Sequence, residues 1–285
     1  ARAQAEDAST VTSGSASMSR LGFGVSGPLT SLLVDHGHVV RLVREALDLG
    51  ITVFDTAPFY RDLQLPQGIG ERRLAAGIRG YDRSRITLTT KVGEKRFDLL
   101  EFSPSAIEAS VENSLRRLET DYIDYLFIQG APASIWLESD LLECLDRLKG
   151  DKVAHFGLSG RDDEVEAAFG LPVIDALMMP AGGDISATQA DRIRRARGQF
   201  RTFGIEVFAT ARNATRNKSL RHPGAALWYA ARNTFGRPVN SADAPSPESR
   251  EDAAPRAIID FGMDTIVTST TSRAHLRANA ELAGL

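Results

Sequence analysis

Short apolar or β-branched runs alternate with longer helical segments from about residue 20 to the end of the chain. The short runs are mostly continuous rather than strictly alternating, which is typical of strands buried on both faces. Eight runs are predicted to be strands: 21–25, 51–57, 86–93, 122–130, 153–160, 173–181, 205–211 and 264–270.

Each predicted strand is followed by a segment with helical spacing. The expected helices are 38–50, near 70–78, 103–119, 137–150, 162–169, 185–204, 222–233 and 272–284. Ser103 before Pro104 is a typical helix start, and Gly50 is a typical helix end. Eight strand–helix units predict an α/β fold, a (β/α)8 TIM barrel. An open doubly wound sheet is the competing architecture, but it usually has fewer units.

Two segments depart from this alternation. Residues 1–17 are small and polar and lack the apolar stretch of a signal peptide, so we expect a disordered tail, with Met18 as a candidate natural start. Residues 233–255 are rich in Pro, Ser, Ala and acidic residues, and are too long for an ordinary connection. That segment is expected to be irregular, either a mobile surface loop or a lid. Residues 18–285 are expected to form a single barrel domain.

Composition narrows the choice of partners and compartment. A formal charge of −3 gives no electrostatic reason to expect nucleic acid or an anionic membrane. No apolar run approaches the roughly 18–20 residues that span a bilayer. The one cysteine, Cys144, cannot form an internal disulfide and is expected to pack in the core. These features fit a reducing compartment, so we expect a cytoplasmic protein. Its oligomeric state is left open.

Polar side chains stand where the predicted strands end, which in a barrel is the end that carries the chemistry. Asp55 closes the second strand in VFDTAPFY, Tyr60 follows it, and Lys91 closes the third strand in TLTTKVG. An ammonium in an apolar strand needs a partner, and Asp55 is the natural one. The cation would lower the pKa of a neighbouring Tyr60 phenol from about 10, which suits it to proton transfer. A purely structural ion pair, with Tyr60 merely lining the rim, is the alternative.

Five stretches resemble the aldo-keto reductase family in the right order: GITVFDTAPFY, ITLTTKVG, SVENSLRRLETDYIDYLFIQ, VAHFGLS and HLRAN. FDTAPFY and SLRRLETDYIDY are the specific ones, and FDTAPFY is most similar to members that act on free sugars. The resemblance implies the same barrel, a bound NADPH and a catalytic tetrad of Asp, Tyr, Lys and His. Asp55, Tyr60 and Lys91 match the first three.

The fourth position departs from the family. Gln129 stands at the end of the fourth strand, where the family has histidine. A glutamine amide can donate a hydrogen bond to a substrate oxygen, but it cannot titrate. Substrate orientation could therefore survive, whereas proton relay through this position could not.

The positions that correspond to the family's nicotinamide contacts also depart from it. After the fifth strand the family has Ser-Asn, and this chain has Ser159 and Gly160. Met178 stands near the place of a glutamine that holds the carboxamide, and Thr210 near that of an aromatic residue that stacks on the ring. These changes argue against ordinary redox chemistry.

The adenosine end of the cofactor site is better preserved. The segment TSTTSRAHLRAN closes the eighth strand and opens a helix, whose N-terminus favours a phosphate. The resemblance implies 2′-phosphate and adenine contacts in this segment, with Asn279 on the adenine; ordinary helix capping is the alternative. The candidate cofactor-binding residues here are Ser269, Thr270, Thr271, Arg273, His275 and Asn279, with Ser272 beside them. Ser269 replaces the family's usual lysine, so the choice of NADPH over NADH rests on Arg273 and His275.

Other conspicuous residues are expected to be structural. His36 and His38 have metal-like spacing without accompanying ligands, so no metal site is expected. His155 alternates with apolar residues and is expected in the core, and the basic stretch 192–201 is expected to be a solvated helix face.

Two hypotheses follow. The first is an NAD(P)H-dependent oxidoreductase for a small, polyhydroxylated carbonyl or sugar substrate, with Tyr60 as general acid/base, NADPH as cofactor and NADH as the alternative. The second is a related protein without ordinary redox turnover, either a lyase or isomerase or a non-catalytic nucleotide-binding subunit.

Overall fold

Eight parallel strands close into a barrel in chain order, which confirms the predicted (β/α)8 fold. The computed structural model describes residues 17–59, 67–93, 100–182, 185–207, 223–227 and 261–285. β1 pairs with β2 on one side and with β8 on the other, which closes the ring. The strands are β1 Leu21–Gly24, β2 Val53–Asp55, β3 Thr87–Val92, β4 Ile123–Gln129, β5 Val153–Ser159, β6 Ala176–Pro180, β7 Arg201–Ile205 and β8 Thr265–Thr268.

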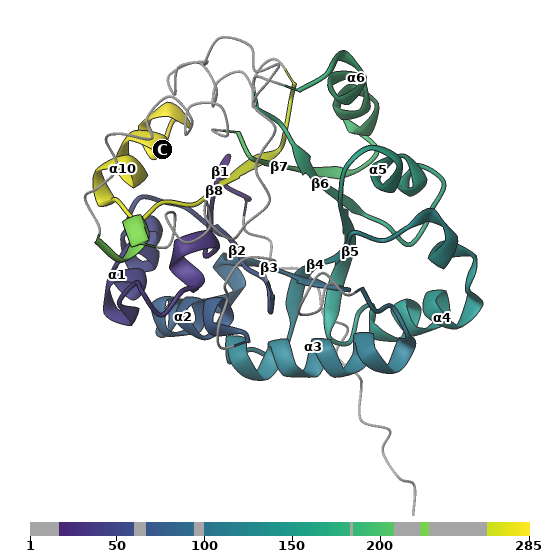
Figure 1. Ribbon diagram of the computed structural model, residues 1–285, viewed down its shortest axis with the longest axis horizontal. Coiled ribbons are helices and arrows are strands. Elements are labelled where there is room, and N and C mark those ends of the chain that lie inside the picture. Colours follow the sequence, from purple (N-terminus) through teal and green to yellow (C-terminus); the bar gives the residue numbers. More distant parts are fainter. Residues whose placement is uncertain (1–16, 60–66, 94–99, 183–184, 208–222, 228–260) are drawn as a thin grey trace, which may run out of the picture.

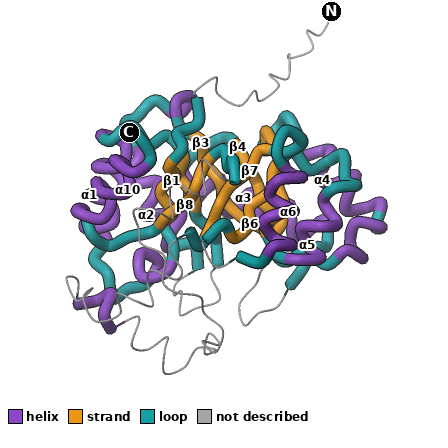
Figure 2. Tube along the Cα trace, turned by 90° about the horizontal axis from the view of Figure 1, so that it is seen from above, coloured by secondary structure: helices purple, strands orange, loops and turns teal. Residues whose placement is uncertain are grey.

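Helices surround the strands in Figure 1, and the view from above in Figure 2 shows the strands enclosed between them. The α-helices are α1 His36–Asp48, α2 Ile69–Ile78, α3 Pro104–Leu118, α4 Ser139–Leu148, α5 Asp162–Ala168, α6 Ala187–Ala196 and α10 Arg273–Leu282. Short 3-10 helices are η1 Gly27–Thr30, η2 Arg83–Arg85 and η4 Ala133–Leu137. Residues 223–227 are also helical, within the expected segment 222–233.

The seventh unit begins earlier than its apolar pattern predicted. The helix expected over 185–204 ends at Ala196, and β7 is Arg201–Ile205 rather than 205–211. Gly198 explains the early end, because its φ of +80° lies in the left-handed region that terminates helices. The apolar run FGIEVF continues past the strand, so hydrophobicity alone misplaced it. Similarly, β6 starts at Ala176, three residues after the expected start.

The barrel interior is filled by side chains and is not a channel. Its interior cluster consists of Val53, Tyr125, Phe127, Ala176, Met178, Phe203 and Val267. The rings of Phe127 and Phe203 meet edge to face, with centroids 5.2 Å apart. Gly157 on β5 permits this packing, since a Cβ there would lie 2.4 Å from the Phe127 ring. The filled interior separates the two ends of the barrel.

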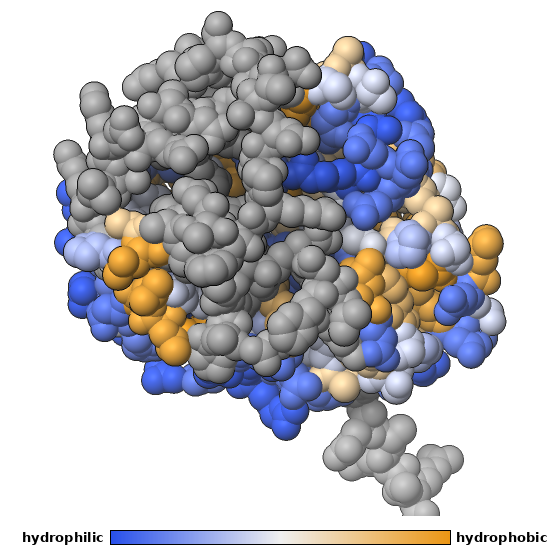
Figure 3. Space-filling view, viewed as in Figure 1, coloured by the Kyte–Doolittle hydropathy of each residue, from blue (hydrophilic) through white to orange (hydrophobic). Residues whose placement is uncertain are grey.

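A second apolar layer lies between the strands and the helices, and it contains Cys144, which is fully buried as expected. On the face shown in Figure 3, the described surface carries mainly hydrophilic side chains with separate apolar patches. None of the helices in the described parts of the chain combines the length and the apolar character needed to cross a membrane. Residues 1–16 and the candidate lid 233–255 lie outside the described residues.

Candidate active site

Two oppositely charged side chains meet inside the carboxyl end of the barrel. Asp55 is the last residue of β2, and Lys91 lies near the end of the adjacent β3. Nζ of Lys91 is 2.6 Å from Oδ1 of Asp55, and the two side chains are 7% and 6% exposed. The ion pair expected from the sequence is therefore present and buried. Removing two charges from water is costly, and this end of the fold is where barrel enzymes carry their chemistry.

Further hydrogen bonds fix the orientation of this ion pair. The Thr89 hydroxyl donates to Oδ1 of Asp55 at 2.5 Å, and Lys91 also donates to the backbone carbonyl of Thr56 at 3.0 Å. Thr89 was not identified from the sequence. Strand alternation could have found it, because residues two apart on a strand share a face. Thr90, between them, faces outward and donates to Glu71 on α2 at 2.9 Å.

Gln129 lies at the same end of the barrel as the ion pair. It is the last residue of β4, next to β3, and is paired in register with Ser159, the last residue of β5. Gln129 is half-buried, and its side-chain Oε1 is buried. The structure thus brings Asp55, Lys91 and Gln129 to one end of the sheet. Tyr60 lies outside the described residues, so its position beside Lys91 stays a prediction.

The residues predicted to contact the nicotinamide offer few strong hydrogen-bonding side chains, as far as the structure describes them. Ser159 is buried, and the backbone N–H of Gly160 donates to the carbonyl of Met178 at 3.2 Å. Met178 is fully buried in the interior cluster, and its thioether is only a weak acceptor. A Cβ at position 160 would lie 2.5 Å from Oε2 of Glu164, which caps α5 by accepting from the Arg161 N–H. The glycine is thus coupled to the start of that helix.

Thr210 was expected at the end of the seventh strand, but it lies outside the described residues. Because β7 ends at Ile205, Thr210 does not follow the strand directly.

The segment that opens α10 is held against β1 and α1. The Ser269 hydroxyl donates to the carbonyl of Gly24 at 2.5 Å and contacts the Ser26 hydroxyl at 2.6 Å. Nε2 of His38 lies 2.8 Å from the carbonyl oxygen of Thr271, which gives this histidine a structural partner. Ser272 caps the helix by accepting from the backbone N–H of His275 at 3.4 Å.

Asn279 lies buried beside this segment. Its side chain is 2% exposed, and its Nδ2 reaches the Thr268 hydroxyl at 3.4 Å. Its Oδ1 is buried without a hydrogen-bond partner among the described residues. A buried unsatisfied acceptor is costly, and the exocyclic amine of an adenine is a donor that could satisfy it. The polar groups that open α10 therefore fit an adenine nucleotide.

A glutamate unnoticed in the sequence holds the arginines of α10. Glu45 on α1 is buried, and its carboxylate accepts from Nε of both Arg273 and Arg277, the latter at 2.6 Å. Both arginine side chains are more than half exposed. No local pattern marks this contact, because Glu45 and Arg273 are 228 positions apart in the sequence. Thus Arg273 is fixed in orientation and partly neutralised.

Within the described residues, no cluster of three or more His, Cys, Asp or Glu side chains is arranged to hold a metal ion. What the described arrangement offers is a fixed ammonium, an amide donor and a nucleotide-compatible helix start around one end of a barrel. These groups suit binding and proton transfer at a polar substrate oxygen.

Comparison with known proteins gives this arrangement a context. A family model described as the Aldo/keto reductase family matches residues 20–171, just over half of the chain. The match covers Asp55, Lys91, Gln129 and Ser159. The candidate residues Met178 and Thr210 and the segment that opens α10 follow the matched region.

Individual relatives and structures are also similar. L-galactose dehydrogenase of Arabidopsis thaliana is 32% identical over 150 residues, 50% of this chain and 45% of that protein. The chain thus spans about half the length of the curated relatives it matches. A holo aldo-keto reductase from Bacillus halodurans superposes with a TM-score of 0.72 at 22% identity, over 98% of this chain and 92% of that one. An aldo-keto reductase from Klebsiella pneumoniae, solved in complex with NADPH, gives 0.63 at 20% identity, over 98% and 91%. At these identities the two structures establish the fold alone.

Proposed function

The chain belongs to the aldo/keto reductase family, and we propose that it is an NAD(P)H-dependent oxidoreductase that interconverts a carbonyl and an alcohol. The observation that carries the proposal is the buried Asp55–Lys91 ion pair at the carboxyl end of the barrel. Because buried ion pairs are weak stabilisers of a fold, we infer that this ammonium serves a neighbouring proton donor.

Tyr60 is proposed as the proton donor in the reductive direction. Its phenol gives a proton to the carbonyl oxygen of the substrate and recovers it from the alcohol in the reverse direction. Lys91 stabilises the phenolate that results, and Asp55 holds the ammonium in place through the 2.6 Å contact. Gln129 donates a hydrogen bond that orients the substrate oxygen. When bound, a nicotinamide dinucleotide supplies or accepts the hydride at the carbonyl carbon.

NADPH is the proposed cofactor, with NADH as the alternative. The unsatisfied Oδ1 of Asn279 and the capped start of α10 support an adenine nucleotide there. Ser159, Gly160, Met178 and Thr210 are proposed to border the nicotinamide. Ser269, Thr270, Thr271, Arg273 and His275 are proposed to border the phosphate and ribose groups. The solved Klebsiella pneumoniae structure with NADPH lends support from a protein of the same fold.

The proposed substrate is a small sugar or another polyhydroxylated carbonyl compound. The similarity to a plant protein named L-galactose dehydrogenase supports this class.

A second candidate function is an acid/base or nucleotide-binding role without redox turnover. Met178 favours it, because a fully buried thioether stands where a carboxamide would need a strong hydrogen-bond partner. Gln129 favours it too, since an amide cannot relay a proton.

Titration with NADPH and NADH, followed by nicotinamide fluorescence and turnover on a panel of sugars and aldehydes, separates these functions. Binding with turnover that falls about 100-fold or more in Tyr60→Phe supports the oxidoreductase. Binding without turnover, unchanged in Tyr60→Phe, would establish a nucleotide-binding protein. No binding of either dinucleotide would contradict the proposed function.

A further inference from the structure

A pocket of about 890 Å³ lies at the amino-terminal end of the barrel, opposite the candidate active site. Arg20, Asp175 and Asp264 directly precede β1, β6 and β8, and Arg201 is the first residue of β7. The volume falls within the roughly 300–1,000 Å³ typical of small-molecule sites. Because the interior cluster fills the barrel, this pocket is separate from the end that carries Asp55 and Lys91.

The two carboxylates of this pocket are already engaged. Asp264 accepts from Arg201 at 2.7 Å and from both the backbone N–H and the hydroxyl of Thr202 at 2.8 Å. Asp175 accepts from Lys149 at 2.9 Å and from the backbone N–H of Phe156 at 3.1 Å, and contacts His155 at 3.6 Å. Neither carboxylate is therefore available to neutralise further cations of the lining.

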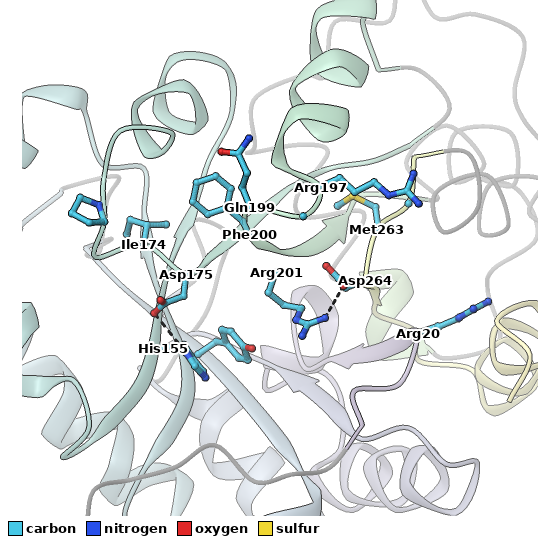
Figure 4. Close-up of a pocket in the computed structure, with 14 residues that line it drawn as sticks. Arg20, His155, Ile174, Asp175, Arg197, Gln199, Phe200, Arg201, Met263 and Asp264 are labelled. Atoms are coloured by element: carbon cyan, nitrogen blue, oxygen red, sulfur yellow. Dashed lines mark hydrogen bonds and ion pairs between the residues drawn. The ribbon is translucent and has the colours of Figure 1, made fainter.

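Two arginines of the lining remain without such a counter-charge. Within the part of the chain that the structure describes, Arg20 and Arg197 form no ion pair, and both are exposed. In Figure 4 they lie on the Met263 side of the pocket, across from Asp175 and His155, and the Arg20 side chain extends away from the other labelled residues. Because both side chains are exposed, their guanidinium groups can turn toward a dianion on this side of the pocket, and each can donate a pair of charge-assisted hydrogen bonds. The overall charge of −3 makes this local excess of positive charge stand out.

The opposite side of the pocket is polar and contains aromatic rings. Tyr125 forms part of the lining and stacks on the half-exposed His155 ring, with centroids 4.9 Å apart. Burial raises the pKa of the Tyr125 phenol and keeps it neutral. His155 was expected in the core, and it instead borders this pocket because it lies near the amino-terminal end of β5.

The basic residues of 192–201, which were expected on a solvated helix face, lie in different environments. Arg192 is buried and paired with Asp162 at 2.9 Å, whereas Arg197 and Arg201 border the pocket.

We propose that this pocket binds a small phosphorylated polyol, such as a sugar phosphate. The phosphate lies against Arg20 and Arg197, and the hydroxylated body extends toward His155 and Asp175, where hydroxyl groups meet side-chain acceptors and donors. The proposal is independent of redox chemistry at the other end of the barrel.

Calorimetric titration at low ionic strength, with the full chain, tests the proposal. Glucose 6-phosphate is the probe, and glucose and inorganic phosphate are compared with it. We expect saturable binding of glucose 6-phosphate, about tenfold weaker binding of inorganic phosphate and none of glucose. The Arg20→Gln/Arg197→Gln variant should lose at least about tenfold in affinity. The matched control is Arg194→Gln, which removes an exposed arginine of α6 that is paired with Asp191 away from the pocket.

Saturating NADPH should leave the affinity for glucose 6-phosphate unchanged, since the candidate cofactor site is at the other end. Absence of saturable binding would overturn the proposal, as would equal losses in the Arg20→Gln/Arg197→Gln and Arg194→Gln variants. Affinity that is unchanged in the Arg20→Gln/Arg197→Gln variant would place the ligand elsewhere. Equal affinities for inorganic phosphate and glucose 6-phosphate would contradict the proposal that the pocket recognises the hydroxylated body of the ligand.

Discussion

Nζ of Lys91 lies 2.6 Å from Oδ1 of Asp55, with both side chains almost completely buried. Thr89 donates to the same carboxylate oxygen. Removing one member of this buried ion pair should strongly lower the stability of the fold, because the other charge would then be buried without compensation. Stability and turnover should therefore respond differently to single and double substitutions.

We predict that Lys91→Met lowers the free energy of unfolding by about 3–5 kcal/mol, and that Asp55→Asn/Lys91→Met recovers a substantial part of that loss. The double variant is more stable than the single one because neither charge remains buried alone. Urea denaturation of the wild type, both single variants and the double variant provides the cycle. Strictly additive losses would contradict a coupled ion pair.

Turnover in these same variants should not recover. If Lys91 tunes the proton donor, reductase activity falls by about 100-fold or more in Lys91→Met and stays low in the double variant. Recovery of turnover together with stability would show that Lys91 serves the fold alone.

Gln129→His is predicted to raise carbonyl reduction. Histidine at the end of β4 could donate to the substrate oxygen and also titrate near neutral pH, which an amide cannot do. We expect about a tenfold or greater gain in kcat with a new pH-dependent limb, measured from pH 5 to 9. Gln129→Asn is the matched control, since it keeps the amide and shortens its reach, and it should not add a limb. An unchanged rate in Gln129→His would assign the limit to another altered contact, with Met178 the leading candidate.

The barrel was predictable because its signal is repeated eight times, and an error in one unit does not change the architecture. Strand ends were also informative: Asp55 and Lys91 follow from alternation and the cost of an unpaired charge. The boundaries predicted for the seventh strand–helix unit were wrong because its apolar run extends beyond the strand. The positive φ of Gly198 shows where the preceding helix ends. Contacts such as Glu45 with Arg273 join residues 228 positions apart, so no local pattern encodes them.

Cofactor preference should depend on Arg273. Its Nε–H donates to Glu45, and its side chain is more than half exposed, so the remaining N–H groups can contact a 2′-phosphate. Arg273→Gln is predicted to weaken NADPH binding about tenfold and to leave NADH binding unchanged. Arg277→Gln is the matched control, because Arg277 shares the same Glu45 carboxylate one turn further along α10. Equal losses for both dinucleotides, or an equal effect of Arg277→Gln, would refute a specific role of Arg273.

Stability in acid should depend on Asp175 at the amino-terminal end of the barrel. Burial alone would raise the pKa of this carboxyl, but the nearby His155 and the hydrogen bonds from Lys149 and the Phe156 N–H outweigh it and lower the pKa below its usual value. A carboxyl whose folded pKa is depressed stabilises the protein above its unfolded pKa of about 3.9, and this contribution is lost as pH falls through the folded value. Asp175→Asn should therefore lower the thermal unfolding midpoint at pH 7, with a difference from wild type that shrinks below about pH 4. Differential scanning fluorimetry across this pH range measures the difference in midpoint.

Asp191→Asn, which removes an exposed partner of Arg194, should change the midpoint little at any pH. A difference for Asp175→Asn that stays constant down to acid would mean that the carboxylate charge contributes nothing and that only the shape of the side chain matters.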